Sequence, residues 1–239
     1  MAAQEDIIMT IWAILPAAGI GRRMGSITPK QYLLVNGATV IAHSLRKLAA
    51  VTAIQKIVVV LHPDDTLWTT LTLDCSDRLQ IATGGDERFQ SVLNGLEALK
   101  DIAAADDWVL VHDAVRPCVR SADIQQLIAT LQQHDVGGLL GMPLENTLKR
   151  VNEAAEVEAT VERSHFWHAM TPQMFRYGLL TDALRDIVKD GVQVTDEAAA
   201  VERLGLRPQM VAGHSDNIKI THEADLLMAG RILETQEGL

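Results

Sequence analysis

The chain has 239 residues, about half of them hydrophobic, and a net charge of −10 at neutral pH. This length suits one α/β domain, and the acidic balance argues against broad, non-specific nucleic-acid binding. Two cysteines, Cys75 and Cys118, are too few for a disulfide framework, so we expect free thiols in a reducing cytosol. No apolar run reaches the roughly 18 residues that span a bilayer, so we expect a cytoplasmic protein without a membrane segment.

The first part of the chain alternates between buried strands and amphipathic helices. The run "KIVVVL" (56–61) is β-branched without polar alternation, which is typical of a strand covered on both faces. Apolar residues recur at helical spacing after Asp86, and we expect Ser121 to cap a later helix. The expected strands are 7–15, 56–61, 78–83, 107–114 and 136–144; the expected helices are 40–50, the one after Asp86 and the one that Ser121 begins.

This alternation over residues 10–142 predicts a doubly wound, mostly parallel α/β sheet. In such sheets ligands bind beyond the carboxyl ends of the strands. Residues 143–170 break the rhythm and predict two polar strands, an exposed β-arm that we expect to pack on a second subunit because a lone hairpin is marginally stable. After the arm we expect helices at 177–189, 196–204 and 223–233, and short strands at 207–213 and 216–221, all within one domain over 1–239.

A glycine-rich turn follows the first strand in the stretch "PAAGIGRRM" (16–24). Its bare backbone N–H groups can approach a ligand closely, and Arg22, Arg23 and Lys30 add positive charge, so we interpret it as a phosphate-binding turn. The alternative is a plain βα turn whose arginines face solvent. The spacing differs from the P-loop and from the dinucleotide fingerprint, which needs a third glycine where this chain has Met24.

A second glycine-containing cluster is "GGDERFQSV" (84–92), which leads into a predicted helix. Helix N-termini offer free N–H donors and attract anions. Asp86 there is either a helix cap or a ligand contact. Arg88 and Ser91, one turn into the helix, are candidates to contact a base or a ribose.

Two later stretches carry isolated charges at strand ends. In "VHDAVRP" (111–117) Asp113 directly follows an apolar strand, where it can bind Mg²⁺ or sugar hydroxyls, and Arg116 adds an anion contact. The alternatives are a capping aspartate and a surface arginine, and we interpret His112 as structural. Lys219 lies in the predicted apolar strand at 216–221, where burial of an unpaired ammonium would be costly. Either a bound phosphate neutralises it, or its side chain extends to the edge of the sheet and places the ammonium in solvent.

Seven motifs in this order resemble the family of 2-C-methyl-D-erythritol 4-phosphate cytidylyltransferases, enzymes of the non-mevalonate isoprenoid pathway. They are "PAAGIGRRM", "TPKQYL", "GGDERFQSV", "VHDAVRPC", "WHAMTPQMF", "TDEAAAVE" and "DNIKIT", and they span nearly the whole chain. The resemblance implies a Rossmann-like fold, CTP as co-substrate, Mg²⁺, and a homodimer formed through the protruding β-arm. Val115 departs from the family, which often has alanine there, and its extra methyl groups narrow the pocket.

The resemblance also implies the residue roles. Lys30, Lys219 and Arg23 act on the reacting phosphates, and the ionised substrate phosphate needs no general base. CTP is bound by Pro16, Ala17, Ala18, Gly19, Gly21, Arg22, Gly85, Asp86, Arg88 and Ser91. Methylerythritol phosphate is bound by Asp113, Ala114, Arg116, Thr147, Arg163, Thr171 and Thr195, with Asp113 also at the metal and Arg163 reaching the partner subunit's substrate.

Other functions stay open at this point. A ribitol 5-phosphate cytidylyltransferase shares the glycine turn and the distal lysine, whereas a sugar-1-phosphate nucleotidyltransferase fits the later motifs less well. A non-catalytic CTP-binding regulator would have no need of both Lys30 and Lys219. A dehydrogenase is disfavoured by the misplaced third glycine.

Overall fold

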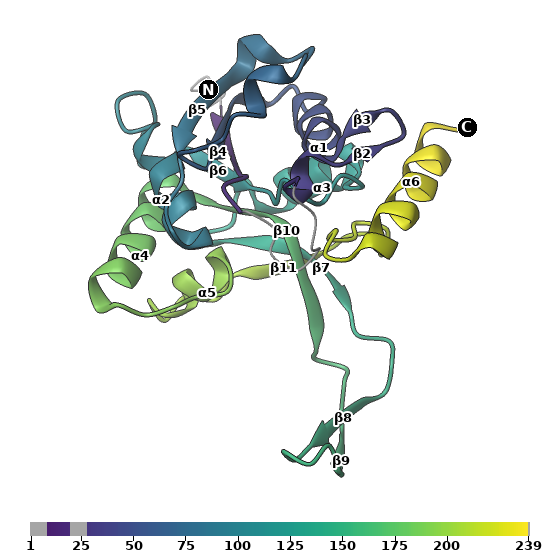
Figure 1. Ribbon diagram of the computed structural model, residues 1–239. Coiled ribbons are helices and arrows are strands. Elements are labelled where there is room, and N and C mark those ends of the chain that lie inside the picture. The colour runs from purple at the N-terminus through teal and green to yellow at the C-terminus, as the bar shows by residue number, and fades with distance from the viewer. Residues whose placement is uncertain (1–8, 20–27, 239) are drawn as a thin grey trace, which may run out of the picture.

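The computed structural model describes residues 9–19 and 28–238. Seven strands form its central sheet: β1 (Ile11–Pro16), β4 (Ile54–Leu61), β5 (Leu79–Thr83), β6 (Trp108–Val111), β7 (Gly137–Pro143), β10 (Trp167–Arg176) and β11 (Gln209–Ala212). Their order is β11–β7–β10–β6–β1–β4–β5 (Figure 1). All neighbours are parallel except β10, which is antiparallel to both β6 and β7. The prediction of a mostly parallel sheet is confirmed.

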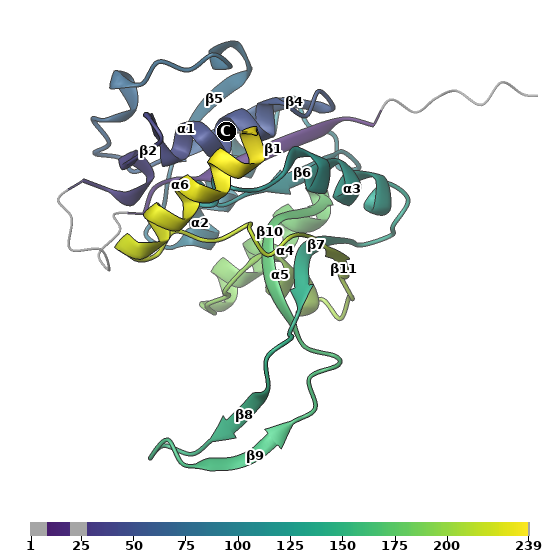
Figure 2. The ribbon, with the colours of Figure 1, turned by 90° about the vertical axis from the view of Figure 1, so that its right-hand side faces the viewer.

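Helices cover both faces of this sheet (Figures 1 and 2). The strand β4 shows the reason, because Ile57 and Val59 enter one hydrophobic core while Val58 and Val60 enter the core on the opposite face. The prediction of a doubly covered strand at 56–61 is therefore confirmed. On the first face lie α1 (Val40–Ala49) and α3 (Ser121–Leu131); on the second lie α2 (Arg88–Glu97), α4 (Tyr177–Asp190) and α5 (Glu197–Glu202).

Two predicted helix caps are wrong. Ser121 begins α3, but Arg120 is its N-cap, and the Ser121 hydroxyl donates instead to a carbonyl of α1 at 3.3 Å. Asp86 does not cap α2, because Glu87 occupies that position in a capping box. In both cases the capping position differs by one residue from the small polar residue that local preference favours.

The predicted strand at 216–221 is also wrong, since these residues form an irregular segment. The Ile220 N–H donates to the Val115 carbonyl at 2.9 Å, and the Ile220 side chain packs in a small core with residues of α6 (Glu223–Glu237). α6 continues beyond its predicted end at 233 to Gly238, whose left-handed conformation (φ 74°) closes the helix. The segment is apolar because it packs against α6, not because it joins a sheet.

The predicted hairpin is confirmed as an arm that projects away from the body of the molecule (Figure 2). It consists of β8 (Leu148–Val151) and β9 (Val157–Val161), which pair with each other in a separate antiparallel sheet. Val157 near its tip and Phe166 at its base are exposed. Among the described residues, the helices are too short or too polar to cross a bilayer.

Candidate active site

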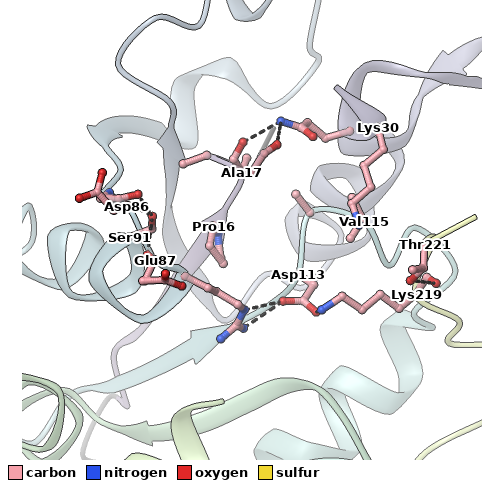
Figure 3. Close-up of a pocket in the computed structure, with 16 residues that line it drawn as sticks. Pro16, Ala17, Lys30, Asp86, Glu87, Ser91, Asp113, Val115, Lys219 and Thr221 are labelled. Atoms are coloured by element: carbon pink, nitrogen blue, oxygen red, sulfur yellow. Dashed lines mark hydrogen bonds and ion pairs between the residues drawn. The ribbon is translucent and has the colours of Figure 1, made fainter. Parts of the chain in front are cut away.

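A cavity of about 370 Å³ opens beyond the carboxyl ends of β1 and β6, where the chain switches from one side of β1 to the other (Figure 3). The predicted site residues that line it are Pro16, Ala17, Ala18, Gly19, Lys30, Gly85, Asp86, Arg88, Ser91, Asp113, Ala114 and Lys219. The residues that line it without having been predicted as ligands are Gln31, Glu87, Val115 and Thr221. The predicted ligands Gly21, Arg22 and Arg23 lie outside the described residues.

Hydrogen bonds from both sides hold the turn after β1. The Ala17 N–H continues the sheet by donating to the Val60 carbonyl at 2.8 Å. The buried amide of Gln31 donates to the carbonyls of Ala17 (2.8 Å) and Gly19 (3.1 Å). Gln31 therefore holds the described part of the predicted phosphate turn, residues 16–19, a role that its position within "TPKQYL" did not reveal.

The two predicted catalytic lysines reach the cavity from different segments. Lys30 begins a 3₁₀ helix, Lys30–Tyr32, and its Nζ donates to the Ile220 carbonyl at 3.1 Å. Lys219 Nζ lies 2.8 Å from Asp113 Oδ2, and its side chain is 40 % exposed. The expectation that Lys219 sits inside an apolar strand is therefore wrong: the segment is no strand, and Asp113 provides a counter-charge without any bound phosphate.

Asp113 is the electrostatic centre of the cavity (Figure 3). Its carboxylate is only 8 % exposed, and it accepts from Arg88 at 2.9 Å and from Lys219 at 2.8 Å, with the Arg116 guanidinium at 3.6 Å. Burial alone would raise the pKa of Asp113, but the charges of Arg88 and Lys219 outweigh burial and hold the pKa far below its ordinary range. Asp113 is therefore ionised wherever the protein is folded near neutral pH.

The backbone of Asp113 is fixed by a buried chain of hydrogen bonds. His112 is fully buried, and burial lowers its pKa to about 4, so its ring is neutral. Its Nε2 must carry the proton, because it faces the Arg116 carbonyl at 3.1 Å, which can only accept. Its Nδ1 therefore accepts from the Thr171 hydroxyl (3.0 Å), and the Thr171 oxygen accepts the Asp113 N–H (3.1 Å). The hydroxyl proton of Thr171, a predicted substrate ligand, is thus already committed to His112.

We predict a pH-dependent stability that originates at His112. Because its pKa is lowered on folding from 6.5 to about 4, only the unfolded chain binds a proton here between these pH values. The contribution of neutral His112 to the free energy of unfolding is complete above pH 6.5. It declines by about 3 kcal/mol as the pH falls towards 4. Urea unfolding of wild type and His112→Gln across this range measures the difference, which should shrink at low pH; a constant difference contradicts the assignment.

The N-terminal turn of α2 forms the opposite wall of the cavity. The Gly85 N–H donates to the Ser91 hydroxyl at 3.1 Å. A Cβ on Gly84 would collide with the Ala18 side chain, so the close approach of this loop to the β1 turn requires glycine. The two glycine-containing motifs, which are distant in sequence, therefore contact each other at the cavity.

Arg88 joins the cavity to a carboxylate that was not a predicted ligand. Glu197 is 1 % exposed, and its oxygens accept from Arg88 at 2.6 and 3.2 Å. From the sequence alone, an acidic residue in the first turn of a helix is expected to be an exposed charge that stabilises the helix. The complete burial of Glu197 would have marked it as a site residue, but this burial is visible only in the folded chain.

Five predicted substrate ligands do not line the cavity: Arg116, Thr147, Arg163, Thr171 and Thr195. Thr147 and Arg163 lie exposed on the arm, and Thr195 lies exposed just before α5. The Arg116 guanidinium points to the irregular segment, where it donates to the Asn217 carbonyl at 2.8 Å. Their roles towards a substrate stay predictions.

Comparison with known proteins fits this geometry. Residues 11–235 match the family described as 2-C-methyl-D-erythritol 4-phosphate cytidylyltransferase. The proteins of that name from Hahella chejuensis and Tolumonas auensis are 48 % and 45 % identical to this chain, covering 95 % and 96 % of it and 96 % and 99 % of themselves.

Solved structures agree with the sequence match. The 2-C-methyl-D-erythritol 4-phosphate cytidylyltransferase of Francisella tularensis superposes with a TM-score of 0.80 at 36 % identity, covering 93 % of this chain and 99 % of its own. A 4-diphosphocytidyl-2C-methyl-D-erythritol synthase superposes with a TM-score of 0.81, also at 36 % identity, covering 94 % and 98 %. This chain therefore belongs to the 2-C-methyl-D-erythritol 4-phosphate cytidylyltransferase family.

Proposed function

We propose that this protein transfers the cytidylyl group of CTP to the phosphate of 2-C-methyl-D-erythritol 4-phosphate and releases pyrophosphate. Membership of the family supports this reaction. The observation that carries it is the cavity itself, where a glycine turn and two lysines from distant segments converge at the switch point of the sheet. A cavity with these donors suits a ligand that carries several phosphates.

The chemistry is an in-line displacement at the α-phosphorus of CTP. A phosphate oxygen of the methylerythritol substrate forms the new P–O bond while the bond to the β-phosphate oxygen breaks, and the electron pair leaves with pyrophosphate. Both reactants are anions, so positioning and charge neutralisation supply the catalysis. Lys30 and Lys219, which line the cavity from separate segments, would supply this positive charge.

Magnesium is expected from the family resemblance, and it commonly binds through one or two carboxylates together with substrate phosphates. Among the described residues, no three His, Cys, Asp or Glu side chains converge on one point. The oxygens of Asp113 already accept from Arg88 and Lys219. The described residues therefore do not fit a metal held by side chains alone, and Asp113 as a metal ligand stays a prediction.

Pyrophosphate release tests the function. We expect release with CTP and methylerythritol phosphate, at fixed magnesium, and loss of the signal with a chelator. Faster release with ribitol 5-phosphate would assign the chain to that reaction instead. Binding of CTP without release of pyrophosphate from either polyol phosphate would support a non-catalytic regulator.

We further propose a homodimer in which the arm of one subunit completes the site of the other. The arm projects from the body and exposes apolar side chains such as Val157 and Phe166, which a second subunit would cover. Thr147 and Arg163 on this arm would then reach the partner subunit's substrate. The cytoplasmic location stays a prediction.

Mixed dimers test this arrangement. Lys30→Ala disables the site in the body of its own subunit, whereas Arg163→Ala disables the arm. In a dimer of one such subunit each, one site has both an intact body and an intact arm. Equal mixing of two inactive variants should therefore restore about a quarter of wild-type activity. Absence of any recovery after subunit exchange, checked by native mass spectrometry, would place Arg163 on its own subunit's site.

A further inference from the structure

We propose that Glu197 is a positioning residue for the reaction: through Arg88 it sets the orientation of Asp113 and, through Asp113, the place of Lys219. The proposal rests on the function proposed above. Glu197 does not itself line the cavity. It begins a continuous row of alternating charges that runs from the buried first turn of α5 to the cavity: Glu197, Arg88, Asp113 and Lys219.

The buried end of this row is firmly anchored. Glu197 is the first residue of α5 and is fully buried. Asp196, the N-cap of α5, accepts from the Gln173 amide of β10 at 3.0 Å, while the Gln173 oxygen accepts the Ala198 N–H at 2.8 Å. The carboxylate of Glu197 therefore starts from a point tied to the central sheet.

Arg88 occupies the middle of the row and bridges two carboxylates. Its Nη1 donates to Glu197 at 2.6 Å and its Nε donates to Asp113 Oδ1 at 3.0 Å, while its Nη2 lies between the two carboxylates, 3.2 Å from Glu197 and 2.9 Å from Asp113 Oδ1. A guanidinium presents its donors in a rigid fork, so the bidentate bond to Glu197 orients the Nε–Nη2 edge that faces Asp113. A flexible single charge at this position could not hold both partners in fixed directions.

The exposed end of the row is Lys219. Because Arg88 holds Oδ1 of Asp113, the other oxygen, Oδ2, faces Lys219 Nζ at 2.8 Å. This contact holds a partly exposed lysine at the cavity before any ligand arrives. Fixing the side chain in advance removes rotamer freedom that would otherwise be lost in the transition state.

Stability alone does not account for such a row. Replacement of a buried ion pair by apolar residues is often neutral or stabilising, so a buried pair is weak support for a purely structural role. In this row Glu197 is the least exposed side chain, and Lys219 at the other end lies at the proposed reaction site. Placement of the cavity charges is the function that this geometry favours.

The first test compares Glu197→Gln with Glu202→Gln, a matched control at an exposed position of the same helix. We expect Glu197→Gln to lower kcat about 10–100-fold, with the dissociation constant for CTP changed far less, and Glu202→Gln to leave both at wild-type values. Assays run at a temperature where circular dichroism shows all proteins folded. A lowered melting temperature with unchanged kcat would show a merely structural role and overturn the proposal.

A second variant separates charge from placement and guards against loss of folding. Glu197→Asp keeps the negative charge but withdraws the carboxylate by one methylene. We expect its kcat to fall as well, by roughly tenfold, because Arg88 must follow or lose its bidentate bond. Full activity in Glu197→Asp would mean that only the charge matters, which contradicts positioning.

An NMR measurement without substrate distinguishes this proposal from the proposed function. The Arg88 Nε–H signal of the free protein, assigned by its loss in Arg88→Lys, should shift or broaden in Glu197→Gln. An unchanged signal overturns the proposal even if the enzyme is active. Wild-type protein that releases no pyrophosphate overturns the proposed function, and the catalytic part of this proposal with it.

Discussion

We expect Lys30→Ala to lower kcat about 10²–10³-fold, as removal of one preorganised donor to developing charge typically does. Lys30 directly precedes Gln31, which holds the described start of the predicted phosphate turn, and it lines the same cavity as residues 16–19. Its Nζ also lies 3.1 Å from the Ile220 carbonyl, so the ammonium links the turn to the segment that carries Lys219. Removal of this charge should therefore affect the phosphates of both reactants.

The matched control is Lys100→Ala, an exposed lysine just beyond the end of α2 that does not line the cavity. Both variants have the same change in net charge, so a general electrostatic effect would appear in both. Steady-state pyrophosphate release gives kcat and KM, and calorimetry gives CTP affinity. A kcat for Lys30→Ala close to wild type would remove Lys30 from the mechanism.

The second large effect is expected for Asp113→Asn, which removes the shared counter-charge of three cations. Lys219 then loses its 2.8 Å partner and is free to leave the cavity, so we expect kcat/KM to fall by about 10²-fold or more. Arg88 and Arg116 are left facing a neutral amide in a largely buried place. Breaking a buried ion pair in this way costs about 3–5 kcal/mol, measurable by urea unfolding at pH 7.

The stability difference between wild type and Asp113→Asn should depend on pH in a defined direction. Arg88 and Lys219 hold the folded pKa of Asp113 below its unfolded value. The contribution of Asp113 to the free energy of unfolding is therefore fully present above the unfolded pKa of about 3.9 and is lost as the pH falls further. The stability gap between wild type and Asp113→Asn should be constant from pH 7 to 5 and narrow below 4. Asp101→Asn, at an exposed position, serves as the control. A gap that widens in acid would mean that the carboxylate is not ionised in the folded protein.

Local patterns were sufficient for the architecture and for much of the cavity. Alternating strands and helices predict the doubly wound sheet, and ligand binding at the carboxyl ends of its strands follows from that topology. The glycine motifs at 16–24 and 84–92, together with Asp113 and Lys219, therefore could be assigned to one region. In the folded chain, residues from both glycine motifs line a single cavity together with Asp113 and Lys219.

The structural roles of individual residues were less predictable where a local sequence is compatible with more than one structure. The helix caps at Ser121 and Asp86 were each misplaced by one residue: Glu87 caps α2 in a capping box, and the N-cap of α3 is Arg120, which makes no side-chain capping bond. Residues 216–221 have the composition of a strand, but their apolar side chains pack under α6. The composition of a segment indicates that it is buried, but not which element it packs against.

The sequence by itself determined which apolar faces are buried, where the chain turns and which motifs meet at the sheet edge, because these depend on periodicity and on local backbone preference. Only the tertiary structure decided how the charges pair. Arg88 and Glu197 are 109 positions apart, and Lys219 meets Asp113 from another segment again. Such pairs form between segments that the fold brings together, and no periodicity along the chain records which distant partner a charged side chain will find.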